Sequence, residues 1–221
     1  GRDLKLSSSR VAGYRNFGTK LWNAARFAEI NNCKPYENFD PKAVKEIINQ
    51  WIIGETTRFK ETFDKALMAY RFNDAAQTAY NHVWGKFCDW YVEFAKLLLS
   101  GANENSRKET QRTMAWALDQ CLIILHPIMP FITEEIWGSI CDRSNMLITC
   151  NWPEYMEADM QNLSAENEIG WVITVIEQIR SVRSELMVPA GSKVPFSQIN
   201  LDSNLKEVIE RNLILIERLG R

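Results

Sequence analysis

Apolar side chains recur every three or four residues through most of residues 10–125, which is the period of an amphipathic α-helix. The pattern falls into four stretches, at residues 10–31, 41–70, 73–101 and 106–125. Pro35, Gly101 and Pro127 separate or end them, and these residue types commonly close helices. Four such helices joined by short connections predict an antiparallel helix bundle.

The chain after Pro127 has a different pattern. Residues 133–137, 164–186 and 203–219 have helical spacing, whereas residues 146–149 and 193–201 are candidate short strands. We therefore expect a mainly α fold in two parts. Residues 1–150 form the helix bundle, and residues 151–221 form a linker and the start of a small, truncated C-terminal α/β appendage.

Composition and motifs exclude several classes of protein. With 46% hydrophobic and 24% charged residues the chain has an ordinary soluble composition, and no apolar run approaches the roughly 20 residues that cross a bilayer. The five scattered cysteines suit a reducing, cytoplasmic compartment. Neither histidine lies in a metal-binding or catalytic motif, and the glycine-rich phosphate-binding loops are missing. We expect no membrane segment, metal, cofactor or catalytic residue, and the initial glycine indicates a piece of a longer polypeptide.

The charge is unevenly distributed along the chain. The net charge is −2, but residues 1–40 carry +3 and the remainder −5. Between Arg143 and Arg180 there is no lysine or arginine. Because binding to a nucleic-acid backbone depends on cations, a nucleic-acid surface would lie on the first helix rather than on residues 144–179.

Phe27 lies on the polar side of the first predicted helix. An apolar arc collects eight side chains: Val11, Tyr14, Phe17, Leu21, Trp22, Ala24, Ala25 and Ala28. The opposite arc collects Arg15, Asn16, Thr19, Lys20, Asn23 and Arg26, with Phe27 in its middle. One possibility is that the ring belongs to the core because the helix is covered by protein on both sides. The other is that an unpaired base stacks on the ring while the neighbouring cations hold phosphates. Geometry alone favours the core, because aromatic side chains are usually buried.

Four strings in the chain resemble the valyl-tRNA synthetase family. They are GYRNFGTKLWNAARF at 13–27, FCDWY at 87–91, HPIMPFITEEIW at 126–137 and IRSVRSE at 179–185. Their order is similar to that of the family's anticodon-binding region, and the resemblance covers nearly the whole chain. The third string is shared with leucyl and isoleucyl enzymes, whereas KLWNAARF and IRSVRSE are far more particular to valyl enzymes of bacterial type.

The resemblance implies that the first helix meets the anticodon loop. Phe27 would stack on an anticodon base, and Arg26 and Lys20 would engage phosphates or base edges. Valine anticodons share A at the middle position and C at the last, and Asn16 and Asn23 are candidate amide readers of base edges. Arg15 either bonds phosphate or forms an intramolecular ion pair.

Further candidates follow with weaker support. Phe72 and Asn73, at a turn at one end of the bundle, could approach the same loop, although a turn aromatic is commonly a lid on the core. Arg180 and Arg183, three residues apart on one helix face, could grip phosphate or dock against the parent enzyme.

The resemblance also implies what lies outside the chain. Valine tRNA and a catalytic domain of the same polypeptide would be the partners, and ATP and Mg²⁺ would serve the full-length enzyme, which we expect to be a monomer. Two alternatives remain open: the corresponding domain of an isoleucyl or leucyl enzyme, and a helical protein-interaction scaffold that binds no RNA.

Overall fold

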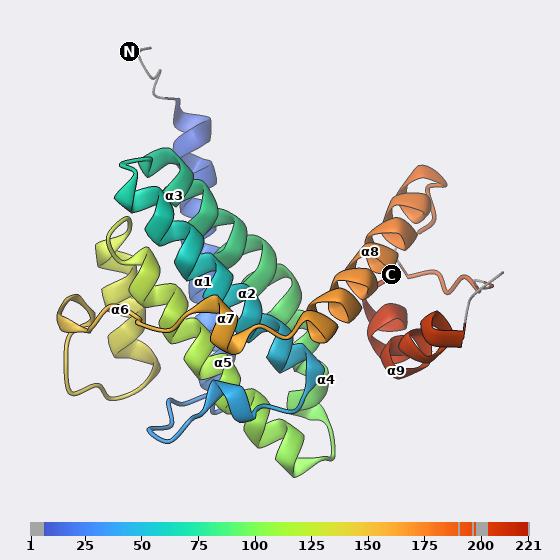
Figure 1. Ribbon diagram of the computed structural model, residues 1–221. Coiled ribbons are helices and arrows are strands. Elements are labelled where there is room, and N and C mark those ends of the chain that lie inside the picture. Colours follow the sequence, from blue (N-terminus) through green and yellow to red (C-terminus); the bar gives the residue numbers. More distant parts are fainter. Residues whose placement is uncertain (1–6, 190, 196, 198–202, 221) are drawn as a thin grey trace. The chain divides into compact units, whose positions relative to one another are not determined.

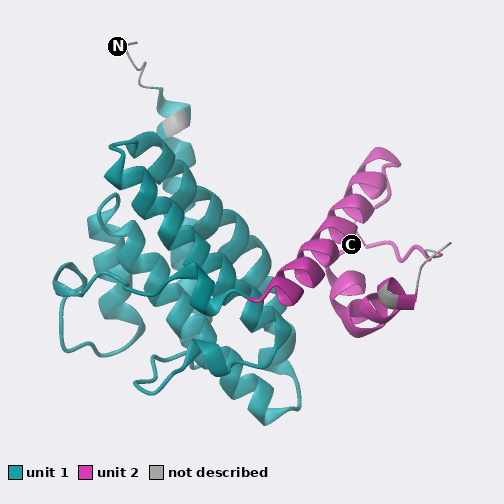
Figure 2. Ribbon diagram, in the orientation of Figure 1, with its two compact units in different colours: residues 1–161 teal, residues 162–221 magenta. Residues whose placement is uncertain are grey.

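The computed structural model describes residues 7–189, 191–195, 197 and 203–220, and every regular element in these residues is helical (Figure 1). The α-helices are α1 Ser8–Ile30, α2 Ile47–Met68, α3 Phe72–Tyr80, α4 Val92–Ser100, α5 Glu104–Leu125, α6 Pro130–Ile140, α7 Glu157–Met160, α8 Leu163–Glu185 and α9 Ser203–Leu219. Short 3-10 helices cover Pro41–Ala43 and Leu147–Thr149. The chain divides into two compact units, residues 1–161 and 162–221 (Figure 2).

The first unit is the expected helix bundle. Helices α2, α4 and α5 pack against one another, and α1 and α6 pack along their flank. The largest side chains that are fully buried come from these elements and from the segment before α4: Trp51, Phe63, Phe87, Tyr91, Phe94, Met114 and Leu118. The apolar stripes of the sequence therefore predict the bundle correctly.

The third predicted helix is wound in two ways. A continuous helical run from Phe72 to Ser100 contains a π-helical segment, Asn81–Tyr91, between α3 and α4. This segment carries the buried rings of Phe87 and Tyr91, and the Tyr91 hydroxyl donates to Oδ1 of Asn49 on α2 at 3.0 Å. Wide π turns commonly occur where a helix is adapted to a site or to its packing.

The described residues of the C-terminal part show no strand, so the predicted α/β character is not found there. Leu147–Thr149, one of the two candidate strands, forms a 3-10 helix. The reason is local: the Glu134 carboxylate on α6 accepts hydrogen bonds from the backbone N–H groups of Leu147 and Ile148, at 2.7 and 3.2 Å. Of the other candidate strand, residues 196 and 198–201 lie outside the described residues, and residues 193–195 and 197 have no regular structure.

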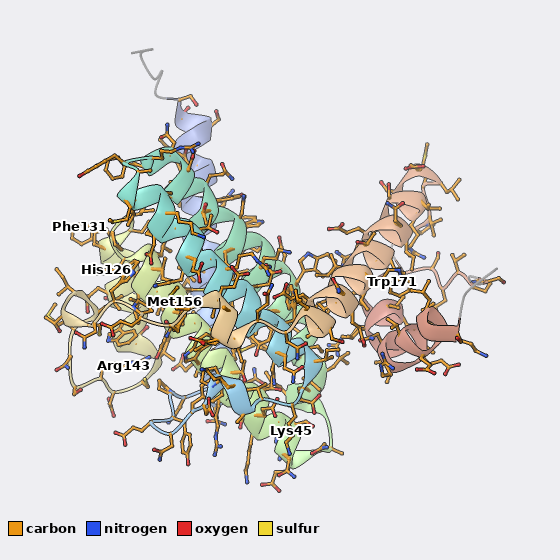
Figure 3. The ribbon with its side chains drawn as sticks, viewed as in Figure 1. Lys45, His126, Phe131, Arg143, Met156 and Trp171 are labelled. Carbon is orange, nitrogen blue, oxygen red and sulfur yellow. The ribbon has the colours of Figure 1, made fainter. Side chains whose placement is uncertain are left out.

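The bundle has two ends. Figure 3 shows Lys45, just before α2, towards one end, and Phe131, at the start of α6, towards the other. Helix α1 begins at the end where α2 finishes and α3 starts, and runs towards the end that carries Lys45 (Figure 1).

In the part of the chain that the structure describes, no helix is long and apolar enough to cross a membrane.

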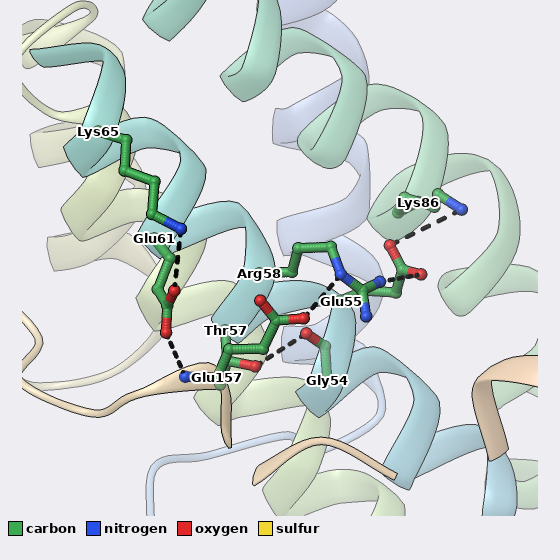
Figure 4. A network of polar contacts seen from close by, with 8 residues as sticks. All are labelled: Gly54, Glu55, Thr57, Arg58, Glu61, Lys65, Lys86 and Glu157. Atoms are coloured by element: carbon green, nitrogen blue, oxygen red, sulfur yellow. Dashed lines mark hydrogen bonds and ion pairs between the residues drawn. The ribbon is translucent and has the colours of Figure 1, made fainter. Parts of the chain in front are cut away.

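Residues 151–161 pack on the bundle, although the sequence predicts a boundary after residue 150. Figure 4 shows Glu157 beside α2, where its carboxylate accepts a hydrogen bond from Nε of Arg58 at 2.8 Å and its backbone N–H donates to Glu61 at 2.6 Å. Trp152 Nε1 donates to Asp64, also on α2, at 3.0 Å. These bonds fasten α7 to the first unit.

The second unit is a pair of helices. Helices α8 and α9 bury Ile169, Val172 and Ile176 together with Val208, Leu215 and Ile216. Glu168 on α8 holds α9 through polar contacts, accepting from Arg211 Nη2 at 2.8 Å and from Asn212 Nδ2 at 2.7 Å.

Candidate nucleic-acid interface

Helix α1 buries one side against the bundle and leaves the other side open. Phe17, Leu21, Ala24, Ala25 and Ala28 are buried, and α6 and the π-helical segment cover them. The apolar arc predicted from the sequence extends further, to Val11 and Tyr14, but these side chains are 51% and 69% exposed. They lie in the first turns of α1, where a Cβ built at Gly13, between them, would meet no neighbouring element within 4 Å, whereas one at Gly18 would lie 3.0 Å from Ile132 of α6.

Four candidate residues lie on the open face of α1. Arg15, Asn16, Asn23 and Arg26 are exposed, and their side chains form no hydrogen bond or ion pair with the described residues. The intramolecular ion pair considered for Arg15 is therefore not formed within the described part of the chain. Side-chain donors without protein partners can bond an incoming phosphate or base edge without first breaking a contact.

Phe27 is half-buried on the rim of this face. Lys96 of α4 places its ammonium nitrogen 5.7 Å from the centroid of the Phe27 ring. The same nitrogen lies 2.5 Å from Oε1 of Glu93. The side chains of Lys96 and Glu93 are 33% and 36% exposed, so this side of the ring faces charged groups and solvent rather than the apolar core. The ring is neither a fully buried core residue nor wholly exposed.

Lys20 is already occupied by contacts within the bundle. Its ammonium forms an ion pair with Asp89 and lies 3.8 Å from the centroid of the Trp84 ring. Trp84 in turn stacks on Phe17 and Tyr80, with centroid distances of 6.4 and 5.6 Å. These contacts fasten α1 to the π-helical segment, so a phosphate that bound Lys20 would compete with Asp89.

Phe72 and Asn73 are exposed but lie at the other end of the bundle from Phe27. The contacts along α1 show this, because Phe17 meets Tyr80, Lys20 meets Trp84 and Phe27 meets Lys96. Helix α1 and the run from α3 to α4 are thus parallel, and Phe72 is level with the first turns of α1. At 1.5 Å per residue, roughly 25 Å separates that level from Phe27. The structure does not bring these two residues to the same site.

Arg180 and Arg183 belong to the second unit and bond within it. Nε of Arg180 donates to the Leu219 carbonyl near the end of α9 at 2.7 Å. Nη2 of Arg183 donates to the carbonyls of Pro189 and Ser192, at 3.3 and 3.0 Å, and so holds the chain that follows α8. Both side chains therefore have a structural role whether or not they also meet phosphate.

The structure adds one residue that the sequence did not indicate. Lys96 lies far from Phe27 in the sequence, and its approach to the ring follows from the packing of the parallel helical run beside α1. With Arg26 exposed on the same helix as Phe27, the half-buried ring has a cation on each of two helices nearby. An aromatic face flanked by cations is a pattern typical of single-stranded nucleic-acid sites.

Comparison with known proteins decides the family. The sequence profile of the family described as anticodon-binding domain of tRNA ligase matches residues 49–198, more than half of the chain. The chain belongs to the anticodon-binding domain family of tRNA ligases. This membership agrees with the helical bundle and with the resemblance found in the sequence.

The similar proteins in this family are valine–tRNA ligases. The chain is 51% identical to that of Ruegeria pomeroyi, 46% to that of Caulobacter vibrioides and 43% to that of Zymomonas mobilis, in each case over 100% of the chain. It spans 22% of the length of the first relative and 25% of the other two. The sequence-based assignment to the valyl family is confirmed, and the chain corresponds to the anticodon-binding part of a longer enzyme.

Proposed function

We propose that this chain binds the anticodon loop of valine tRNA and positions the tRNA for valine attachment by a catalytic domain elsewhere in the same polypeptide. The observation that carries the proposal is the half-buried ring of Phe27 on the rim of α1, with the Lys96 ammonium 5.7 Å from its centroid and exposed Arg26 as the preceding residue of the same helix. A base stacked on an aromatic ring contributes about 1–3 kcal/mol, and neighbouring cations bind the backbone phosphates.

Stacking alone does not select a sequence, because every base has a π face. Selection needs hydrogen bonds to base edges, and amide side chains supply both donors and acceptors. Asn23 is one turn of α1 before Phe27, and Asn16 lies two turns further back on the same side of the helix. We therefore propose Asn23 as the nearer reader of a base edge, with Asn16 and Arg15 contacting the strand beyond it.

The remaining parts of the assignment concern the longer polypeptide. ATP and Mg²⁺ would serve its catalytic domain, and we expect the enzyme to be cytoplasmic and monomeric. In the residues that the structure describes, no three His, Cys, Asp or Glu side chains are grouped to hold a metal ion.

The test is a comparison of RNA affinities. Binding of the chain to valine, isoleucine and leucine tRNAs is measured by filter binding at one low salt concentration, for the native protein and for Phe27→Ala. We expect preference for valine tRNA, and a loss of about 1–3 kcal/mol of binding free energy in the variant with unchanged helix content. Phe27→Tyr, which keeps the ring, is the matched control and should retain most of the affinity.

Each other outcome has a definite meaning. Preference for isoleucine or leucine tRNA would contradict the proposed selection of valine tRNA. No affinity for any tRNA would favour a protein-interaction scaffold and end the proposal. Global unfolding of Phe27→Ala would show that the ring acts as a core residue, and the binding site would then have to be sought elsewhere.

A further inference from the structure

A second exposed ring lies beyond the end of α1. Tyr36, in the loop between α1 and α2, is 46% exposed. The guanidinium carbon of Arg112 on α5 lies 3.9 Å from the centroid of its ring. Arg112 is itself exposed and forms no ion pair with the carboxylates that the structure describes. A guanidinium stacked on an aromatic ring without an acidic partner keeps its charge and its donors available for an anion.

Arg112 also lines a pocket of about 450 Å³, whose other polar lining residues include Asn38, Asn105 and Lys108. The side-chain amides of Asn38 and Asn105 form no hydrogen bond with the described residues. Amides that can both donate and accept match the edges of nucleobases. The volume lies within the range of small-molecule sites.

Two carboxylates also line the pocket, and both are engaged by backbone donors. Asp40 Oδ1 accepts from the N–H of Lys42 at 2.9 Å. Glu109 accepts from the N–H of Lys45 at 3.0 Å through one oxygen and from that of Glu46 at 2.8 Å through the other. These bonds partly offset the negative charge and leave the side-chain donors of the two amides and of Arg112 for a ligand, whereas the Lys108 ammonium pairs with Glu104 at 2.6 Å.

The loop that carries Tyr36 is held in place at several points. The N–H of Cys33 bonds the Ala28 carbonyl at 2.9 Å, and Nε2 of Gln111 donates to the Asn31 carbonyl at 2.8 Å. Phe39 packs against Trp116 with a centroid distance of 6.2 Å. A site whose supporting shell is fixed in this way loses little entropy when a ligand binds.

We propose that the Tyr36–Arg112 pocket binds an unpaired nucleotide of the same RNA loop that Phe27 receives. The base lies against the Tyr36 ring with its edge towards Asn38 and Asn105, and its phosphate contacts Arg112. This inference rests on the proposed function, because it assigns a second contact to the same RNA. The loop begins directly after α1, whose last turns carry Phe27, so one RNA loop at this end of the bundle meets both rings.

The experiment uses stem-loop RNAs with the sequence of the valine tRNA anticodon arm, each with 2-aminopurine at one loop position, because stacking quenches that base's fluorescence. Affinity and quenching are measured for the native chain and for Tyr36→Ala, Tyr36→Phe, Arg112→Gln and Phe27→Ala. Tyr14→Ala and Lys65→Gln are matched controls, since these side chains are also well exposed, at 69% and 78%, but lie away from the pocket.

We expect Tyr36→Ala to weaken binding roughly tenfold and Tyr36→Phe to leave it nearly unchanged. Arg112→Gln should weaken binding severalfold and lower the slope of log affinity against log salt by about one. One loop position should lose its quenching in Tyr36→Ala and keep it in Phe27→Ala, and another position should show the reverse. The two controls should bind as the native chain does.

Native affinity in both Tyr36→Ala and Arg112→Gln, together with weak binding in Phe27→Ala, would overturn this inference and leave the proposed function standing. No binding of the native chain to any stem-loop would overturn both. Because Arg112 is exposed, its variant tests the site even if Tyr36→Ala disturbs the loop.

Discussion

The two ends of the bundle differ in the side chains they present. The end where α1 finishes, here called the polar end, presents Arg26, Phe27, Tyr36, Lys96 and Arg112, so that each aromatic ring has a cation beside it. The opposite end, here called the apolar end, presents Val11, Tyr14, Met68, Tyr70 and Phe72, all of them more than half exposed. Rings beside cations suit nucleic acid, whereas contiguous exposed apolar side chains are typical of surfaces that contact protein.

The residues that follow the helix C-termini also differ between the two ends. Asn32, two residues after α1, has a φ of 56°, and Tyr70, two residues after α2, also has a φ of 56°. Asparagine tolerates this left-handed conformation, but a bulky aromatic adopts it at a cost. The polar end is therefore built from residues suited to their backbone, while the apolar end holds an unfavourable residue that is 81% exposed.

The largest predicted effect concerns how the polar end is held together. Glu109 accepts hydrogen bonds from the N–H groups of Lys45 and Glu46 and, at 3.0 Å, from Asn49 Nδ2, and so caps the start of α2 from another helix. We expect Glu109→Ala to lower the free energy of unfolding by about 2–4 kcal/mol, because charge-assisted bonds are lost and the Asn49 amide is left without one partner. Urea unfolding measures this loss.

Glu104→Ala is the matched control on the same helix. Glu104 is 62% exposed and, among the described residues, its carboxylate pairs with Lys108 alone, so its removal should leave stability nearly unchanged. Equal stability of the two variants would show that the polar end is not organised around Glu109.

Acid should destabilise the core that joins the two ends. His82, in the π-helical segment, is buried, stacks on Phe59 at 4.5 Å and lies 3.3 Å from the Thr56 hydroxyl. Burial, with a smaller contribution from the charge of Lys86, lowers the pKa of His82 to about 3. The unfolded chain, with a histidine pKa near 6.5, binds the proton first as the pH falls.

The contribution of neutral His82 to the free energy of unfolding is complete above about pH 6.5 and is lost progressively between about pH 6.5 and 3. The loss reaches about 2 kcal/mol at pH 5. His82→Gln removes the titrating group, so the fall in unfolding free energy from pH 7 to pH 5 should be smaller in the variant by that amount. Identical falls in the two proteins would show that His82 does not remain neutral in the folded chain.

The sequence predicts elements better than it predicts their partners. The helices follow from the apolar period, because burying one face of each helix is the strongest constraint on a bundle. Val11 and Tyr14 have the right spacing for burial but are exposed, and a Cβ built at Gly13, between them, would meet no neighbouring element within 4 Å. The candidate strand at 146–149 is not formed. The backbone N–H groups of Leu147 and Ile148 donate to the Glu134 carboxylate on α6, and the spacing of apolar residues does not predict such a contact.

The same limit applies to the candidate interface. Helix geometry alone favours a core position for Phe27, whereas the structure shows a half-buried ring that faces Lys96. The ion pair of Lys20 with Asp89 could not be predicted from the sequence. Helical spacing places Lys20 on the polar arc of its own helix, but it does not show which carboxylate of another helix lies beside it. Contacts between helices depend on how the helices pack, and the spacing of apolar residues within one helix does not predict that packing.

Two neighbouring residues on α4 should change RNA binding in opposite directions. Lys96 faces the Phe27 ring and pairs with Glu93. Lys96→Gln should weaken binding of the anticodon stem-loop by about 1 kcal/mol and lower the salt slope by about one, whereas Glu93→Gln should strengthen binding, because it releases the ammonium and removes a repulsive charge. Fluorescence anisotropy across several salt concentrations measures both changes.

A purely structural ion pair would give a different result. In that case the two variants would lose similar stability and neither would alter RNA affinity. Lys65→Gln, at an exposed cation of α2, controls for the general effect of lowering the net charge.

The smallest predicted effect tests the apolar end. Tyr70→Asn should raise the free energy of unfolding by about 0.5–1 kcal/mol, because asparagine accepts the left-handed conformation more readily than tyrosine. The gain is limited by loss of the contact between the Tyr70 and Phe72 rings, whose centroids are 6.4 Å apart. Thermal and urea unfolding measure the change, and stem-loop affinity should stay the same.

Met68→Asn provides the comparison, since Met68 is 83% exposed at the same end but lies within α2. Asparagine is the poorer helix former, so this variant should gain no stability. If Tyr70→Asn were as stable as the native chain or less so, the backbone at this turn would not be strained. If it lost affinity for the stem-loop as Phe27→Ala is expected to do, the apolar end would take part in RNA binding and the division between the ends would fail. A gain in stability with unchanged affinity would mean that tyrosine at this position favours neither folding nor anticodon recognition, which is the behaviour of a residue that serves a contact with protein.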